Sequence, residues 1–456
     1  MKMFCLIVFF LFSFGVSAQN EFIIVVNTNP NVSILPQFSS TTSSQFILPL
    51  RENTLDYEVE YQKVDSISLV PLTSYSESIS VEQETDKYLI SFPEPGFYRI
   101  KVTSPDGNLI RWANENSDFI NEIPSLTSPD MSYQQKKIYR IDQWGNLKWT
   151  SFYMAFNNCV YLDVTALDTP DLTNVTDCFG MFLSCDNLVY NPSINNWDVL
   201  NITDMTGMFL HCNSFNQPLN DWQVDNVLSM ENMFSNAPLF NQPLNNWNVG
   251  NVNNFNEMFL WADDFNQPLN FWNVTQGINM VSMFNGATSF NQSLGEWNLG
   301  KNVLLFSFLS DSGMDCSNYY ETLNGWANNS SIPMNKAIGV EGLQYASNTV
   351  QPRNILINDK NWSFNGDVFS ETNCLLNNSD FVFDKVVIFP NPATDFLYVT
   401  STNDFVRYEI YDALGKKVAT NDFQQHIVTQ NLSQGNYILK LYDKNNQKYT
   451  AKFIKK

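Results

Sequence analysis

Few side chains in this sequence have the types and spacing that catalysis or metal binding requires. The 456 residues include only two histidines, His211 and His426, and neither has a His or Cys neighbour at the spacing of a metal-binding motif. Asp263 and Asp264 are adjacent on an expected turn, whereas glycosidase carboxylates flank a bond from several ångströms apart. Nucleophile-elbow, zinc-helix and phosphate-loop motifs do not occur. The sequence therefore predicts no catalytic residue, no cofactor, no metal site and no enzymatic activity.

The cysteines could form disulfides or remain buried thiols. Cys159, Cys185 and Cys212 each stand three residues after a phenylalanine, so they share one repeat position. Such positions on neighbouring coils would lie about 5 Å apart, within disulfide range, but three residues cannot all pair. We favour buried thiols, a common state of free cysteine. Disulfides stay open among Cys159, Cys178, Cys185, Cys212, Cys316 and Cys374.

These residues belong to an internal repeat of 25 residues. Five tryptophans recur at that interval, together with a Met-Phe pair and a block such as Phe240-Asn-Gln-Pro-Leu244. We interpret the recurring side chains as core packing, because one coil cannot bury them and stacked coils can. The predicted repeat core is Trp197, Trp222, Trp247, Trp272, Trp297, Met208, Phe209, Met233, Phe234, Met258, Phe259, Met283 and Phe284.

Two periodicities alternate inside each repeat. Trp247-Asn-Val249 has the spacing of a strand, and Val249, Val252, Phe255 and Met258 step by three like a helical or 3₁₀ stripe. A short strand and a short helix in about 25 residues are typical of leucine-rich-repeat-type solenoids. The middle of the chain is therefore predicted to be a β/α solenoid of this type.

Charge restricts the partners of the repeats. From Trp149 to Gly300 there are 14 Asp and Glu and no Lys or Arg, whereas the whole chain has a net charge of −21. A stretch without cations cannot displace counterions from nucleic acid or dock on anionic lipid. Nucleic acid is therefore excluded as a partner; divalent cations, basic proteins and neutral glycans remain open.

The N-terminus is predicted to be a signal peptide, residues 1–18. Lys2 is followed by an apolar run from Phe4 to Phe14 and by the small-residue site Val16-Ser17-Ala18. No later segment is long and apolar enough to span a membrane, so no transmembrane segment is expected after cleavage. The mature protein is expected to be secreted.

Both ends of the mature chain read as β structure. Gly96-Phe-Tyr-Arg-Ile-Lys-Val102 and Tyr437-Ile-Leu-Lys-Leu441 are typical of half-buried strands. We therefore expect a multidomain, β-rich chain with an N-terminal β-sandwich (19–136), the central solenoid (137–367), a linker (368–383) and a C-terminal β-sandwich (384–456).

Residues 137–367 resemble the BspA-like surface-protein repeats of leucine-rich type, which are also abundant in mycoplasma lipoproteins. Besides the 25-residue repeats, the likeness includes the entry block 141–149 and the exit blocks 315–319, 323–326 and 361–367. It implies a surface protein whose repeats mediate interactions.

Three motifs and a basic terminus mark the C-terminal segment: Pro390-Asn-Pro-Ala393, Ile410-Tyr-Asp-Ala-Leu-Gly415 and Leu432-Ser-Gln-Gly-Asn-Tyr437. On these residues, the segment from Val387 to Lys456 resembles the type A C-terminal sorting domain of the type IX secretion system of Bacteroidota. This likeness implies the secretion machinery as a partner and attachment at the outer-membrane surface. In that family the domain is commonly removed when cargo is attached to lipopolysaccharide; whether it is cleaved here stays open. The implied sorting signal is Pro390, Asn391, Pro392, Gly415, Gly435, Tyr437, Lys452, Lys455 and Lys456.

Residues 19–136 more loosely resemble a PKD-like sandwich. The Trp-Gly-Asp-Gly turn of that family is absent after Tyr57-Glu-Val-Glu-Tyr61. A calcium or glycan role is therefore not carried over, and calcium binding stays open.

Two functions follow. The first is a non-catalytic cell-surface adhesin or scaffold that binds an unknown surface protein or glycan. The alternative is an accessory polysaccharide-binding or polysaccharide-degrading protein whose N-terminal sandwich binds glycan. The missing catalytic residues favour the first, and the sequence does not name the ligand.

Overall fold

The computed structural model describes residues 21–28, 44–51, 58–76, 83–84, 87–104, 109–112, 135–371, 387–389, 393–400, 405–412, 416–423, 426–444 and 448–456. The chain forms two compact units, residues 1–376 and 377–456, each described here by itself. The predicted signal peptide, Pro390, Asn391, Pro392, Gly415, Cys374 and residues 372–383 of the predicted linker lie outside the described residues. The described structure is β-rich with few helices.

The N-terminal part of the first unit is built on a sheet in the order β11-β9-β1-β7-β4. Alternate residues of β7 are buried, as the period of two predicts for a strand with one covered face. The bounds are β1 Phe22–Asn27, β4 Glu58–Val64, β7 Phe97–Thr103, β9 Ile138–Gln143 and β11 Asp163–Val164.

Two three-stranded sheets accompany this sheet, in the orders β2-β6-β5 and β10-β8-β3. Their bounds are β2 Gln45–Leu48, β3 Leu50–Arg51, β5 Gln83–Glu84, β6 Lys87–Ser91, β8 Leu109–Trp112 and β10 Lys148–Ser151.

The sheet runs across the domain boundary expected at residue 136. Strand β9, which lies after this boundary, pairs antiparallel with β1 and parallel with β11. A single buried cluster also extends from Phe22 to Trp362. The N-terminal sheets therefore cover the first coil of the repeats and share its core.

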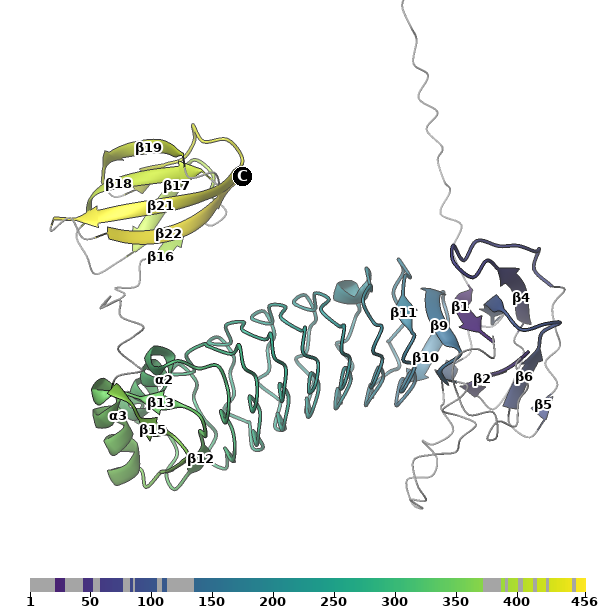
Figure 1. The fold of residues 1–456 in the computed structure, drawn as a ribbon, viewed down its shortest axis with the longest axis horizontal. Helices are drawn as coiled ribbons and strands as arrows, with labels where there is room; N and C mark the ends of the chain where they lie inside the picture. Colours follow the sequence, from purple (N-terminus) through teal and green to yellow (C-terminus); the bar gives the residue numbers. More distant parts are fainter. Residues whose placement is uncertain are drawn as a thin grey trace, which may run out of the picture. The chain divides into compact units, whose positions relative to one another are not determined.

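The repeats form successive coils stacked along one direction (Figure 1). Isolated parallel bridges join one coil to the next at Asp177, Asp204, Ser229, Asn254, Asn279 and Leu304. No strand forms at Trp247–Val249, and the bridge to the next coil lies at Asn254 instead. Of the helical or 3₁₀ stripe expected over residues 249–258, only single 3₁₀-type bonds form, and the continuous helix is wrong. Met258 N–H does bond Phe255 O three residues back (3.2 Å), but the N–H groups of Phe255 and Glu257 bond Asn279 O and Val281 O of the next coil (2.7 and 2.9 Å). Because alternate N–H groups leave the segment, a continuous helix cannot form; within residues 165–315 the one regular helical turn is η2 (Ile194–Asn196).

Helices close the far end of the stack. Asp315 caps α2 (Cys316–Asn328) by accepting a bond from Asn318 N, and α2 packs against α3 (Ser347–Asn358). Parallel pairs β12/β14 and β13/β15 lie beside them. Their bounds are β12 Ala337–Gly339, β13 Gln344–Tyr345, β14 Ser363–Asn365 and β15 Val368–Phe369. The linker predicted from residue 368 thus starts later, because β15 still pairs within the stack.

The second unit contains two antiparallel sheets, β16-β17-β20 and β19-β18-β21-β22. Leu397 and Ile427 of the first sheet and Ile410, Leu439 and Phe453 of the second meet in one core. The bounds are β16 Val387–Phe389, β17 Phe396–Thr400, β18 Phe405–Asp412, β19 Lys417–Asp422, β20 His426–Val428, β21 Gly435–Asp443 and β22 Lys448–Lys455.

Candidate functional site

The five repeat tryptophans stand in one column inside the stack. Trp197, Trp222, Trp247, Trp272 and Trp297 are at most 3% exposed, and neighbouring ring centroids lie 6.3–6.4 Å apart. From the second onward, each indole N–H donates to a backbone carbonyl of the preceding coil, at 2.6–3.0 Å. The acceptor for Trp222 is Ile194 O. The acceptors for the later three tryptophans are the leucine carbonyls of the Phe-Asn-Gln-Pro-Leu blocks. Tryptophan therefore supplies both apolar volume and the donor that a buried carbonyl needs.

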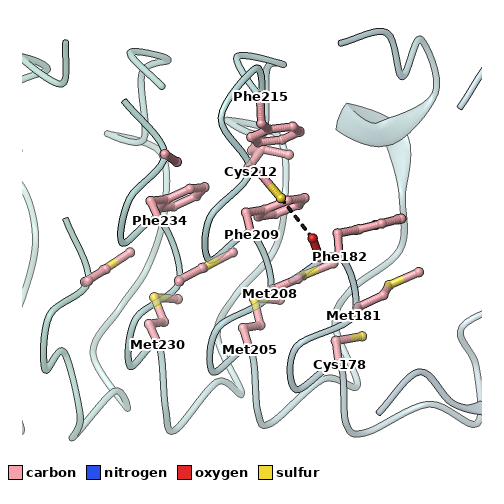
Figure 2. Packing of buried hydrophobic residues seen from close by; sticks show 14 of the residues in the cluster. Cys178, Met181, Phe182, Met205, Met208, Phe209, Cys212, Phe215, Met230 and Phe234 are labelled. Carbon is pink, nitrogen blue, oxygen red and sulfur yellow. Dashed lines mark hydrogen bonds between the residues drawn. The ribbon is translucent and has the colours of Figure 1, made fainter. Parts of the chain in front are cut away.

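The Met-Phe pairs form further columns, part of which Figure 2 shows from Met181 and Phe182 to Phe234. Their phenylalanines lie 6.3–6.5 Å from the repeat tryptophans, centroid to centroid. Phe209, Phe234, Phe259 and Phe284 stack at 5.5–5.7 Å, and each also lies 3.9–4.1 Å from the phenylalanine of its own Phe-Asn-Gln block. The preceding methionines, Met208, Met233, Met258 and Met283, are at most 1% exposed. All these positions therefore face the interior.

An asparagine ladder runs along the same blocks. The Asn241 side-chain oxygen accepts from Asn266 N (3.0 Å) and Gln267 Nε2 (2.8 Å) of the next coil. Asn216 and Asn266 accept from the following coils in the same way, and Asn291 accepts from Asp315 N and Asn318 at the end of the stack. The side-chain oxygens of Asn216, Asn241, Asn266 and Asn291 are thus structural acceptors that join their coils to the next.

The cysteine ladder consists of thiols. Cys159, Cys178, Cys185 and Cys212 are free and fully or almost fully buried. The Cys185 and Cys212 thiols donate to Phe156 O and Phe182 O of the preceding coil, at 3.1 and 2.9 Å. Figure 2 shows the second of these bonds. Burial raises the pKa of each of these thiols above its usual range. Cys316, in contrast, is disulfide-bonded.

The outer side of the bridging segments is the candidate interaction surface. We call it the bridge face; it is formed by the outward side chains of residues 177–184, 204–211, 229–236, 254–261, 279–286 and 304–311. These segments run parallel in adjacent coils, so equivalent residues form columns across the face. A binding surface built in this way can change its chemistry coil by coil while the interior stays constant.

The last residue of each segment shows this variation most clearly. Ser184, His211, Asn236, Trp261, Gly286 and Asp311 all have a φ between 54° and 69°. The coil therefore requires a left-handed backbone at this position but no particular side chain. Asn, Asp and Gly suit this conformation, whereas Trp does not.

The polarity of the face changes along the stack. The bridge column holds Asp177, Asp204, Ser229, Asn254 and Asn279, and then Leu304, which is 43% exposed. Two residues further along each segment, the column begins with the half-buried Phe179, which stacks on Tyr153 at 5.0 Å. It continues with the polar Thr206, Glu231 and Asn256 and ends with Val281 and Phe306, which is 54% exposed. The face is thus polar over its middle coils and partly apolar at its first and last ones.

Glu231, a carboxylate of the face, has amide side chains as its hydrogen-bond partners. Glu231 accepts from Asn254 and Asn256 of the next coil, at 2.7 and 3.2 Å. Burial, with the neighbouring Asp204 charge, raises the pKa of Asp177. Among the described residues, Glu231, Glu257 and Asp311 form no ion pair, so their negative charges on the face are not neutralised by a neighbouring cation.

No cluster of His, Cys, Asp or Glu in the described parts of the chain is arranged to hold a metal ion. His211 stands on the exposed bridge face, and His426 packs edge-on to Phe396 in the second unit at 4.9 Å. No helix among the described residues is long and apolar enough to cross a membrane.

The predicted sorting residues that are described lie at different depths in the second unit. Tyr437 is buried, donates to Ser433 O at 2.7 Å and stacks on Phe453 at 5.5 Å. Lys455 is mostly buried, whereas Lys452 and Lys456 are exposed, and Gly435 starts β21. Lys456 N–H bonds Ala393 O at 3.0 Å, next to the parallel bridge between Ala393 and Lys455.

Sequence reasoning missed a polar cluster on the same unit. Glu409 accepts hydrogen bonds from the hydroxyls of Tyr411 and Tyr442 (both 2.8 Å) and from Lys417 (3.1 Å). These bonds lower the pKa of Glu409 to about 2. The four residues come from three strands, so no local spacing indicated them.

Two family models match parts of the chain. The model of the family described as "Mycoplasma protein of unknown function, DUF285" matches residues 150–262, 226–318 and 246–337. The model of the secretion system C-terminal sorting domain matches residues 387–456. The second match supports secretion through the type IX system and attachment to the cell surface. The first is compatible with the resemblance to BspA-like repeats. No curated protein and no solved structure matches the chain.

Proposed function

We propose that this chain is a non-catalytic interaction scaffold, attached at the outer-membrane surface, with BspA-like repeats of leucine-rich type that bind a protein or glycan on the bridge face. The observation that carries the proposal is the contrast between the inside and outside of one segment. Phe209, Phe234, Phe259 and Phe284 are identical and buried, while two residues later His211, Asn236, Trp261 and Gly286 differ completely. The fold sets the interior of each coil, so the outer positions are available for recognition.

The chemistry of the titratable groups supports a binding role. The free thiols are buried with raised pKa values, which suits packing rather than nucleophilic attack. Exposed apolar side chains on the bridge face, such as Phe306, are of the kind that mark interaction surfaces.

The test compares two double variants of the full mature chain in binding to immobilised matrix proteins, a glycan array and whole bacterial cells. Leu210→Arg with Asn256→Arg places two cations on the bridge face and should abolish binding. Gln223→Arg with Gln276→Arg adds the same charge at exposed positions outside that face and should leave binding unchanged. Equal binding by both variants, with both folded, would contradict the proposal; glycan binding that ignores the bridge face would instead favour the N-terminal glycan-binding alternative.

A further inference from the structure

Trp261 occupies a position whose backbone conformation disfavours a large side chain. Its side chain is 53% exposed, whereas the five repeat tryptophans are almost completely buried. Its φ is 54°, in the left-handed region that penalises a large side chain. Equivalent positions hold Asn236 and Asp311, which tolerate this backbone. Backbone strain together with an exposed aromatic ring is typical of binding positions.

The next coil leaves room for this indole. A Cβ at Gly286 would lie 2.2 Å from Cδ1 and 2.7 Å from Nε1 of Trp261. Gly286 itself has a φ of 69°, and it is the one glycine among the described equivalents 158, 184, 211, 236, 261, 286 and 311. The pyrrole side of the indole therefore rests where a side chain at 286 would stand, and the remaining ring surface stays open to solvent.

Acidic residues stand close to Trp261 in the sequence. Glu257 precedes it by four residues and Asp263 and Asp264 follow it in the same coil, while no Lys or Arg occurs from Trp149 to Gly300. Within the described residues none of these three acids forms an ion pair. An exposed aromatic ring in an acidic stretch without Lys or Arg is complementary to a cation.

We infer that Trp261 is an anchor for a Lys or Arg side chain of a basic protein partner. The indole supplies the cation–π contact, and the carboxylates of Glu257, Asp263 and Asp264 supply the attractive field. This inference rests on the proposed function of the bridge face, to which it adds the chemistry of the partner.

The test uses the full mature chain and three defined probes: tetra-arginine, the neutral cellotetraose and tetra-glutamate, measured by calorimetry at low and high salt. Only tetra-arginine should bind, and its affinity should fall as salt rises. Trp261→Ala should weaken it about 2- to 30-fold, the range of cation–π contacts. Glu257→Gln with Asp263→Asn should weaken it and reduce its salt dependence.

Phe271→Ala is the matched control. Phe271 is 77% exposed at a position shared with Asp221, Asn246 and Glu296, outside the bridge face, so its loss should change nothing. Tetra-arginine binding that Trp261→Ala does not weaken would overturn the inference, and so would binding of cellotetraose through Trp261. If the bridge-face arginine variants still lose binding to surfaces while tetra-arginine does not depend on Trp261, the anchor is wrong and the scaffold stands. If the arginine variants keep their surface binding and Trp261→Ala keeps its tetra-arginine binding, both the scaffold and the anchor are contradicted.

Discussion

The indole N–H of Trp247 donates to the backbone carbonyl of Leu219, one coil earlier, at 2.8 Å. This one bond links two motifs of the repeat, the tryptophan and the Phe-Asn-Gln-Pro-Leu block. It crosses 28 residues of sequence and lies in the buried interior. The stack is therefore held by side chain to backbone bonds as well as by apolar contacts.

Replacing Trp247 by Phe should destabilise the first unit by about 1–3 kcal/mol, because the Leu219 carbonyl stays buried without its donor. Urea unfolding followed by circular dichroism measures the change. Trp261→Phe is the control and should cost under about 0.5 kcal/mol, since that ring is exposed. Equal effects of the two substitutions would argue against the role of the indole bond.

Asn241→Ala should also destabilise the stack, by about 1–3 kcal/mol, because Asn266 N–H and Gln267 Nε2 lose their acceptor. Asn246→Ala removes an exposed amide at a nearby turn, for which the structure shows only a main-chain hydrogen bond. This control should be nearly neutral in the same unfolding experiment. A comparable loss in both variants would mean that the ladder contributes little.

The four buried thiols should be inert in the folded protein. A colourimetric thiol reagent should label none of Cys159, Cys178, Cys185 and Cys212 in the native mature chain, and all of them in guanidinium. Because folding raises their pKa values, their contribution to stability is complete below the unfolded thiol pKa of about 8.5 and declines as pH rises above it. Rapid labelling of the native chain would contradict this picture.

Lys137 should have the opposite effect in alkaline solution. Its side chain is 3% exposed and donates to Gln45 O at 2.6 Å, and burial lowers its pKa to about 8. Between about pH 8 and pH 10.4 Lys137 is mostly neutral in the folded chain but still protonated in the unfolded chain. Its contribution to the free energy of unfolding therefore rises with pH over this range. The stability of Lys137→Met relative to the wild type should therefore decrease from pH 8 to pH 10. A constant difference over this range would show that the lysine is not held by desolvation.

Deleting residues 384–456 should stop surface delivery. The deleted segment contains the whole match to the sorting domain, so the truncated chain should accumulate in the periplasm of a type IX-competent host. Protease accessibility on intact cells measures the outcome, with the full chain as the reference. Surface exposure of the truncated chain would contradict the sorting role.

Much of the fold could be predicted from single residues and their spacing. The 25-residue interval of Trp197 to Trp297 determined that equivalent side chains stack, because identical residues at a fixed period can be buried only by neighbouring copies. The two periodicities of a repeat were less informative. The apolar residues from Val252 to Met258 recur every three positions because short turns follow one another there. Which backbone N–H groups bond to the next coil instead of within the turn is decided only by the position of that coil.

The candidate site shows the same division. Sequence alone determined the interior positions, the cation-free stretch and the likeness of the C-terminal segment to a sorting domain. Tertiary structure decided that Trp261 is exposed while the repeat tryptophans are buried, since the side chain at 286 determines whether there is room beside it. It also brought Glu409 to Tyr411, Tyr442 and Lys417 across three strands. The physical reason is that a repeat period fixes contacts between equivalent residues, whereas these contacts join non-equivalent residues whose separation only the folded backbone determines.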